Sequence, residues 1–174
     1  MGLNYQHNFK NNDARLLTLA YKASTNTSLN SSDFSVLPLL NYQGRVSNTR
    51  NDDRTREQTL QLDYVQPIGK QTLEMGLKAS FERNGSNYFY QTRDSLTDVF
   101  VLDPRLSNNF SYEQAIQAAY SSLIIKKNKW RLQAGGRLEI TRLDADFRTS
   151  GTLARQHYTN LVPSLNISRQ AQRG

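Results

Sequence analysis

Cysteine is absent from the 174 residues of the chain, which excludes disulfides, thiol catalysis and thiolate metal sites. Apolar residues are also scarce: they make up 37% of the chain, against roughly 45–50% in globular domains, and the mean hydropathy is -0.69. No apolar run approaches the ~20 residues of a membrane-spanning helix, and no signal peptide opens the chain. Disorder does not explain this composition, because aromatic residues reach 10%. A structure with one apolar face and one wet face does.

Charge of one sign is in excess, with a net charge of +7 and a pI of about 9.8. The basic residues are spread along the chain with acidic residues between many of them, and no RNA-binding aromatic motif or basic helical stripe is present. Because a bare excess of positive charge is a weak signal, we expect no nucleic-acid partner.

The strongest pattern in the sequence is an alternation with a period of two. Between residues 73 and 82, the odd positions are Leu73, Met75, Leu77, Ala79 and Phe81, and the even positions are polar or glycine. Successive side chains of a strand point to opposite faces, so this segment is a strand with one apolar and one charged face. The alternation recurs in residues 17–24, 60–64, 130–141 and 161–168, and less cleanly in residues 3–9.

A further alternating segment covers residues 112–124. Its more apolar face carries Tyr112, Ile116, Ala118, Tyr120 and Ile124, while Glu113, Gln117 and Ser121 share the opposite face. The same logic assigns the first set to the apolar face of the sheet.

Short and long connections alternate between the expected strands. Short polar turns are predicted at residues 10–13, 67–70 and 126–129, where Asn, Asp, Gly and Lys suit tight hairpins. Long polar connections are predicted at about residues 26–56 and 84–110, and a shorter one at about 144–157. This organisation gives about seven antiparallel strands.

These features together predict an all-β fold, an antiparallel up-and-down transmembrane β-barrel of the bacterial outer membrane. The expected strands are long enough for the roughly 9–11 residues that cross the hydrocarbon layer. Short periplasmic turns and long extracellular loops are typical of such barrels. Aromatic residues near strand ends fit an interfacial girdle, namely Tyr64, Tyr120, Trp130 and Tyr158. The alternative is a soluble or surface-exposed β-sandwich or β-barrel that binds a ligand or partner, with its apolar face turned inward.

Particular segments of the sequence resemble those of a known protein family. The segment from Leu60 to Lys78, with Gln66-Pro67-Ile68-Gly69-Lys70 at its turn, resembles a barrel hairpin of TonB-dependent receptor-like outer-membrane proteins of Bacteroidota. Residues 136–141 and 158–168, which include Pro163-Ser164-Leu165-Asn166, resemble a later part of that barrel. The resemblance covers most of the chain from residue 60 onward. It implies a large barrel of about 22 strands filled by a plug, which imports a substrate with energy delivered by TonB.

The chain departs from this family in showing no plug, no TonB box and no closing strand. We therefore expect residues 1–174 to be part of one outer-membrane β-barrel domain, truncated at both ends. The expected partners are outer-membrane lipid, an imported substrate reached through the long loops, and TonB and the plug through the parent chain. Lumen residues are expected to include Lys78, Arg131, Arg137 and Glu139.

Few residues offer chemistry. His7 and His157 lack the spacing of metal ligands, and five loop acids lack calcium-loop spacing, so solvated charge is the simpler interpretation. Those acids are Asp52, Asp53, Asp94, Asp98 and Asp103. Glu74 and Glu82 share a face with Lys78, where salt bridges across a lumen explain them as well as acid–base work. No nucleophile–base pair of an outer-membrane esterase or protease is found. We expect a protein that is no enzyme, with no catalytic, cofactor-binding or metal-binding residues and no cofactor.

Overall fold

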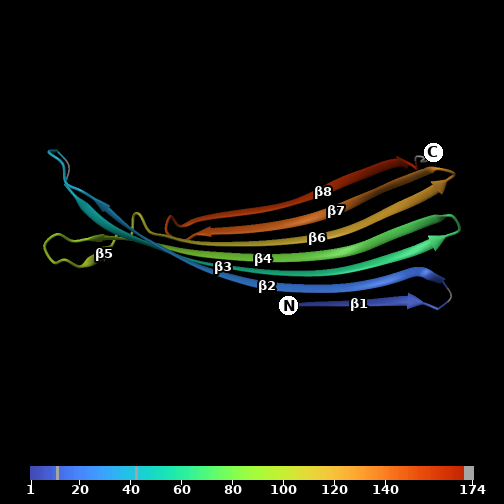
Figure 1. Cartoon of the computed structure of the whole chain (residues 1–174), viewed down its shortest axis with the longest axis horizontal. Coiled ribbons are helices and arrows are strands. Elements are labelled where there is room, and N and C mark those ends of the chain that lie inside the picture. Colours follow the sequence, from blue (N-terminus) through green and yellow to red (C-terminus); the bar gives the residue numbers. More distant parts are fainter. Residues whose placement is uncertain (11, 42, 171–174) are drawn as a thin grey trace.

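The computed structural model describes residues 1–10, 12–41 and 43–170, which form one antiparallel sheet a single layer thick (Figure 1). Its strands run in chain order, β1-β2-β3-β4-β6-β7-β8, with the short β5 paired to β4. Their bounds are β1 Gly2–Phe9, β2 Asn12–Val36, β3 Arg45–Ile68, β4 Gln71–Arg93, β5 Phe100–Leu102, β6 Asn108–Lys127, β7 Trp130–Phe147 and β8 Thr152–Arg169. The up-and-down topology confirms the predicted fold class, with seven strands paired in chain order and the short strand β5 paired to β4 beside them.

The turns at one end of the sheet are tight. β3 ends at Ile68 and β4 begins at Gln71, while β6 ends at Lys127 and β7 begins at Trp130. Gly69 and Asn128 have φ values of 59° and 55° in these turns, a region that glycine and asparagine tolerate best. Both predicted hairpins are therefore confirmed. The hairpin predicted at residues 10–13 also joins two strands, although Asn11 lies outside the described residues.

The long connections are shorter than predicted, because most of their residues belong to strands. β2 continues to Val36 and β3 starts at Arg45, so most of the segment 26–56 forms a β2–β3 ribbon, in which β3 also pairs with β4 from Ser47 onward. β4 continues to Arg93, and β7 and β8 are joined by residues 148–151. The main strands after β1 are 18 to 25 residues long. The ribbon is mostly polar on both faces, and its few apolar residues, such as Leu29 and Phe34, do not recur with a period of two, so it lacks the alternation by which a strand is recognised.

The register of the sheet places apolar side chains in continuous rows. Directly paired residues of neighbouring strands share a face. One row crosses all seven strands of the path through Tyr5, Leu19, Leu62, Leu77, Ala119, Leu138 and Leu161. The next row, on the opposite face, contains Asn4, Ala20, Gln61, Lys78, Ala118, Glu139 and Asn160. The predicted apolar set on β4, residues 73 to 81 at odd positions, therefore lies on one face.

The sheet has no hydrophobic core of its own. Its accessible surface is 13390 Å², whereas a globular protein of this mass exposes roughly 8,700 Å². Among the described residues, the five that are buried all lie on the polar face: Ser47, Ala118, Ile124, Thr141 and Ala145. On the apolar face, Leu77 remains 56% exposed and Leu161 73% exposed. Within residues 1–10, 12–41 and 43–170, no second layer covers this face, as a soluble sandwich would require.

The sheet is also open at both edges. In the described part of the chain, β1 pairs only with β2 and β8 pairs only with β7. No helix in this part of the chain has the length and hydropathy needed to span a bilayer.

Candidate functional site

The apolar face is bounded by aromatic and cationic groups at the short-turn end. The guanidinium of Arg169 lies 5.4 Å from the Trp130 ring centroid, and that of Arg15 lies 4.2 Å from Phe9 and 5.5 Å from Tyr64. Aromatic rings and cations of this kind collect where a bilayer meets water. Tyr64 and Trp130 thus stand where an interfacial girdle was predicted.

A charged row bounds the same face at its other side. Residues Arg56, Arg83, Glu113, Asp144 and Arg155 follow one another across β3, β4, β6, β7 and β8. Arg83 and Glu113 are paired at 2.6 Å, and Arg155 and Asp144 at 3.3 Å. Below this row, the apolar stretch of β4 covers residues 73–81, which matches the roughly 9–11 residues of a membrane-crossing strand.

One predicted strand face is wrong. The set that includes Tyr112, Ala118 and Tyr120 on β6 pairs with Asn84, Lys78 and Gly76 of β4, so it lies on the polar face. The apolar face of β6 is instead formed by Ala115, Gln117, Ala119, Ser121, Leu123 and Ile125. Alternation in β6 is ambiguous because small and amphipathic side chains occupy both faces. Tyr120 and the predicted girdle residue Tyr158 therefore do not belong to an interfacial girdle.

The middle of the polar face holds a hydrogen-bonded network centred on Tyr120. Its hydroxyl donates to the carboxylate of Asp63 on β3, and the amide of Gln61 donates to Asp63 at 2.7 Å and to Tyr120 at 3.1 Å. Tyr120 reaches β3 by crossing over Gly76 of β4, its direct partner in the ladder. A Cβ atom at position 76 would overlap the Tyr120 ring, so glycine makes this reach possible.

The network continues to β7. The Arg137 guanidinium lies 5.5 Å from the Tyr120 ring centroid and is also paired with Glu139. Lys78 lies in the next row, directly paired with Gln61 and Ala118. The predicted lumen residues Lys78, Arg131, Arg137 and Glu139 all share this face, but Arg131 stands near the short-turn end, opposite Lys126.

Aromatic rings line the polar face in its outer half, above the charged row. The rings of Phe110 and Tyr112 are stacked with their centroids 6.4 Å apart, and the Phe110 centroid lies 4.9 Å from that of Phe147. Burial raises the pKa of the Tyr112 hydroxyl, and the negative charge of Glu82 adds to this effect. Sequence reasoning missed this cluster because Phe110 and Phe147 come from strand segments that were interpreted as loops, and because Tyr112 was assigned to the apolar face.

The remaining predicted residues make local contacts. The carboxylate of Asp94 accepts hydrogen bonds from the backbone N–H groups of Thr97 at 3.0 Å and Leu96 at 2.8 Å, which lower the pKa of this carboxyl. Asp98 and Asp103 pair with Arg93 and Arg105. Asp52 pairs with Arg50, and Asp53 accepts a hydrogen bond from Asn51.

The carboxylates and imidazoles are dispersed over the sheet. Glu74 accepts a hydrogen bond from Ser122, while Glu82 bonds Asn84 nearer the outer end. His7 contacts Phe9 edge-to-face, and His157 pairs with Arg142 in the ladder. Within the described residues, no three metal-ligating side chains come together.

A single-layer, up-and-down antiparallel sheet, with an apolar belt on one face and polar networks on the other, defines a section of an outer-membrane barrel wall. Comparison with known proteins agrees. Residues 7–174 match the model of the outer membrane protein beta-barrel family, and the chain belongs to this family. Its place is therefore the bacterial outer membrane.

Several solved structures share the fold of this chain. The ferric citrate transporter FecA superposes with a TM-score of 0.63 at 14% identity, over 98% of this chain and 24% of that one. The FpvAI–pyocin S2 complex superposes with a TM-score of 0.62 at 14% identity, over 97% of this chain and 24% of that one. The copper transporter OprC superposes with a TM-score of 0.53 at 16% identity, over 95% of this chain and 26% of that one. The chain thus spans about a quarter of the structures it resembles. A search of curated proteins found no match.

Proposed function

We propose that this chain forms part of the barrel wall of a TonB-dependent receptor, which takes up a substrate through the outer membrane and binds it without breaking a bond. The observation that carries the proposal is the polar face, where a network from β3 to β7 and an outer aromatic cluster form a continuous lining. Two of the structural relatives are described as transporters, of ferric citrate and of copper.

The outer half of the lining is the proposed substrate contact. Phe110, Tyr112 and Phe147 offer ring faces, and the neighbouring Asn84 and Glu82 offer polar groups. Rings beside hydrogen-bonding groups suit orientation-specific binding of a small polar molecule. The long β2–β3 ribbon extends from the same end of the sheet, opposite the short turns, where it would contact substrate arriving from outside the cell (Figure 1).

The mid-level network is the proposed seat of the plug. Asp63, Arg137 and Glu139 carry charges in a region that faces the barrel interior, where a plug supplies complementary polar groups. TonB acts through the parent chain, and lipid covers the apolar face. The sequence resemblance extends the proposal to a Bacteroidota host, which the origin of the gene tests.

Uptake is tested by comparing nutrient depletion from a defined medium by the wild-type host, a deletion strain and a strain lacking TonB. We expect at least one compound whose depletion requires both genes. Depletion that is independent of TonB, or a parent gene encoding no plug domain, would overturn the proposal of a TonB-dependent receptor while leaving the barrel intact.

Substrate contact is tested with the double variant F110A/Y112A in the full-length receptor. We expect a roughly tenfold or larger loss of uptake, because ring faces contribute on the order of 1 kcal/mol each. The matched control is Phe81→Leu on the lipid-facing side of β4, which is expected to leave uptake unchanged. Equal uptake by both would place the substrate elsewhere.

A further inference from the structure

Three arginines gather on the lipid-facing side of the sheet, just above the apolar belt. Arg56 and Arg83 are direct partners across β3 and β4, and Arg54 lies two residues further along β3, opposite Gly85. Like charges placed opposite one another in a ladder are destabilising without an anion to compensate them. Within the described residues, neither Arg54 nor Arg56 forms an ion pair, and Arg83 has the single partner Glu113.

The surface between these arginines is hollowed. A depression of about 220 Å³ is lined by Arg54, Arg56, Arg83, Asn84, Gly85 and Ser111. Its floor is Gly85, above which the position of a side chain is open space. A second depression of about 380 Å³ adjoins it, shares Arg56 and Arg83, and adds Phe81, Ala115 and Arg142. Its lining also includes the carboxylates of Glu82, Glu113 and Asp144, of which Glu113 is paired with Arg83 and Asp144 with Arg155, so the phosphate is placed in the first depression. Cationic donors around open space form a site for a phosphate group.

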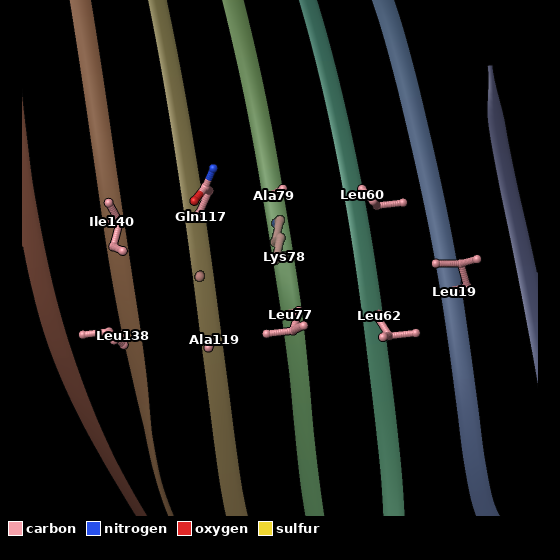
Figure 2. Close-up of a pocket in the computed structure, with 11 residues that line it drawn as sticks. Leu19, Leu60, Leu62, Leu77, Lys78, Ala79, Gln117, Ala119, Leu138 and Ile140 are labelled. Atoms are coloured by element: carbon pink, nitrogen blue, oxygen red, sulfur yellow. The ribbon is translucent and has the colours of Figure 1, made fainter.

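An apolar hollow lies directly below on the same face. It has a volume of about 440 Å³, and Figure 2 shows the leucines of β2, β3, β4 and β7 arranged around Ala79 and Ala119. The two alanines, one on β4 and one on β6, remove bulk from the centre of an otherwise leucine-rich belt. Ala79 stands four residues from Arg83, a separation of roughly 13 Å along the strand.

We propose that this surface binds one phosphorylated glycolipid of the outer leaflet, a lipopolysaccharide, with its phosphate among Arg54, Arg56 and Arg83 and its acyl chains in the hollow over Ala79 and Ala119. The order of the two parts along the strands matches the order of headgroup and chains in the leaflet. The occupant is a lipid because the site is continuous with the apolar belt and lies outside the barrel interior.

The test uses the full-length receptor in lipid nanodiscs, with purified lipopolysaccharide as the probe and native mass spectrometry as the measurement of bound lipid. The variant R54Q/R56Q is expected to weaken binding roughly tenfold or more, because charge-assisted hydrogen bonds to phosphate are lost. The variant R54K/R56K, which keeps both charges, is expected to recover most of the affinity. The control R93Q/R105Q removes two arginine charges near the outer connection after β4 and should bind as wild type does.

Two further comparisons separate this site from general attraction to anions. Ala119→Leu fills the apolar hollow with a side chain suited to lipid. This variant should weaken the binding of lipopolysaccharide several-fold while the barrel keeps the thermal stability of the wild type. Dephosphorylated lipopolysaccharide and vesicles of phosphatidylglycerol should both bind more weakly than the intact glycolipid. Equal binding by R54Q/R56Q and the R93Q/R105Q control, or equal binding of any of these lipids, would overturn the assignment.

Discussion

At the scale of single residues, one glycine organises the polar face. Gly76 lets the Tyr120 ring lie across β4, so that β6 is hydrogen-bonded through this side chain to Asp63 and Gln61 of β3, on the far side of β4. In a sheet without a core, such links between strands replace part of the stabilisation that packing gives a globular protein. The pairing of Gly76 with Tyr120 could not be predicted from the sequence. Tyr120 fits the alternation of an ordinary apolar-face residue until the register of β4 and β6 is known.

Replacing Tyr120 with phenylalanine is expected to lower the free energy of unfolding by about 1–2 kcal/mol, because Asp63 and Gln61 lose a shared partner. The measurement is denaturant unfolding of the full-length barrel in lipid vesicles. The matched control is Tyr112→Phe, since the Tyr112 hydroxyl makes no hydrogen bond within the described residues. Similar losses for both variants would contradict a bonding role for the Tyr120 hydroxyl.

Asp94 gives the connection between β4 and β5 a dependence on pH. Hydrogen bonds from Thr97 and Leu96 lower the pKa of this carboxyl below its ordinary value of 3.8. The stabilisation of the turn is therefore complete above the ordinary pKa and is lost as the pH falls through the lowered one. Amide hydrogen exchange at residues 96–97, corrected for intrinsic rates, is expected to be equally slow at pH 7 and pH 5 and faster near pH 2.

Asp94→Asn supplies the comparison for that experiment. The amide cannot change its charge, so the corrected exchange of the turn should no longer depend on acid. A wild-type turn that is as protected near pH 2 as at pH 5 would show that the carboxylate does not hold it.

At the scale of elements, the strands consist of two parts with different surroundings. On β4, residues 73–81 alternate between leucine-rich and polar faces, while residues beyond Arg83 are polar or aromatic on both. The alternation could be predicted from the sequence because lipid demands apolar side chains on one face. The outer extensions could not, because water on both faces leaves no periodic demand, and they were interpreted as loops.

Opposite faces of one strand should respond differently to the same charge. Leu77→Arg places a guanidinium at mid-belt among lipid chains and is expected to destabilise the barrel by about 2–4 kcal/mol. Ser80→Arg, on the polar face of the same strand, is the control and should cost about 1 kcal/mol or less. The measurement is again unfolding from lipid vesicles, and equal costs would show that the faces are assigned wrongly.

At the scale of the whole molecule, the described residues form a single-layer sheet with two open edges, which supports the proposal that the chain is part of a larger barrel wall. Its large accessible surface is matched by two environments, lipid on one face and a polar interior on the other. The candidate site follows from the same geometry. The sequence predicts which charges face inward, such as Lys78 and Arg137, but not the outer aromatic cluster, whose three rings meet only through strand pairing.

The account rests on the claim that alternate residues of β4 face lipid between residues 73 and 81 and that this alternation ends beyond them. The absence of cysteine makes the chain suited to a direct measurement, because single cysteines can be introduced without removing any. Spin labels at each position from 73 to 92, in the full-length receptor in membranes, report collisions with oxygen in lipid and with a water-soluble nickel complex. We predict preference for oxygen at residues 73, 75, 77, 79 and 81, preference for nickel at the even positions, and preference for nickel at every position beyond 83. Uniform preference for nickel from 73 to 81, or an alternation of opposite phase, would contradict the account.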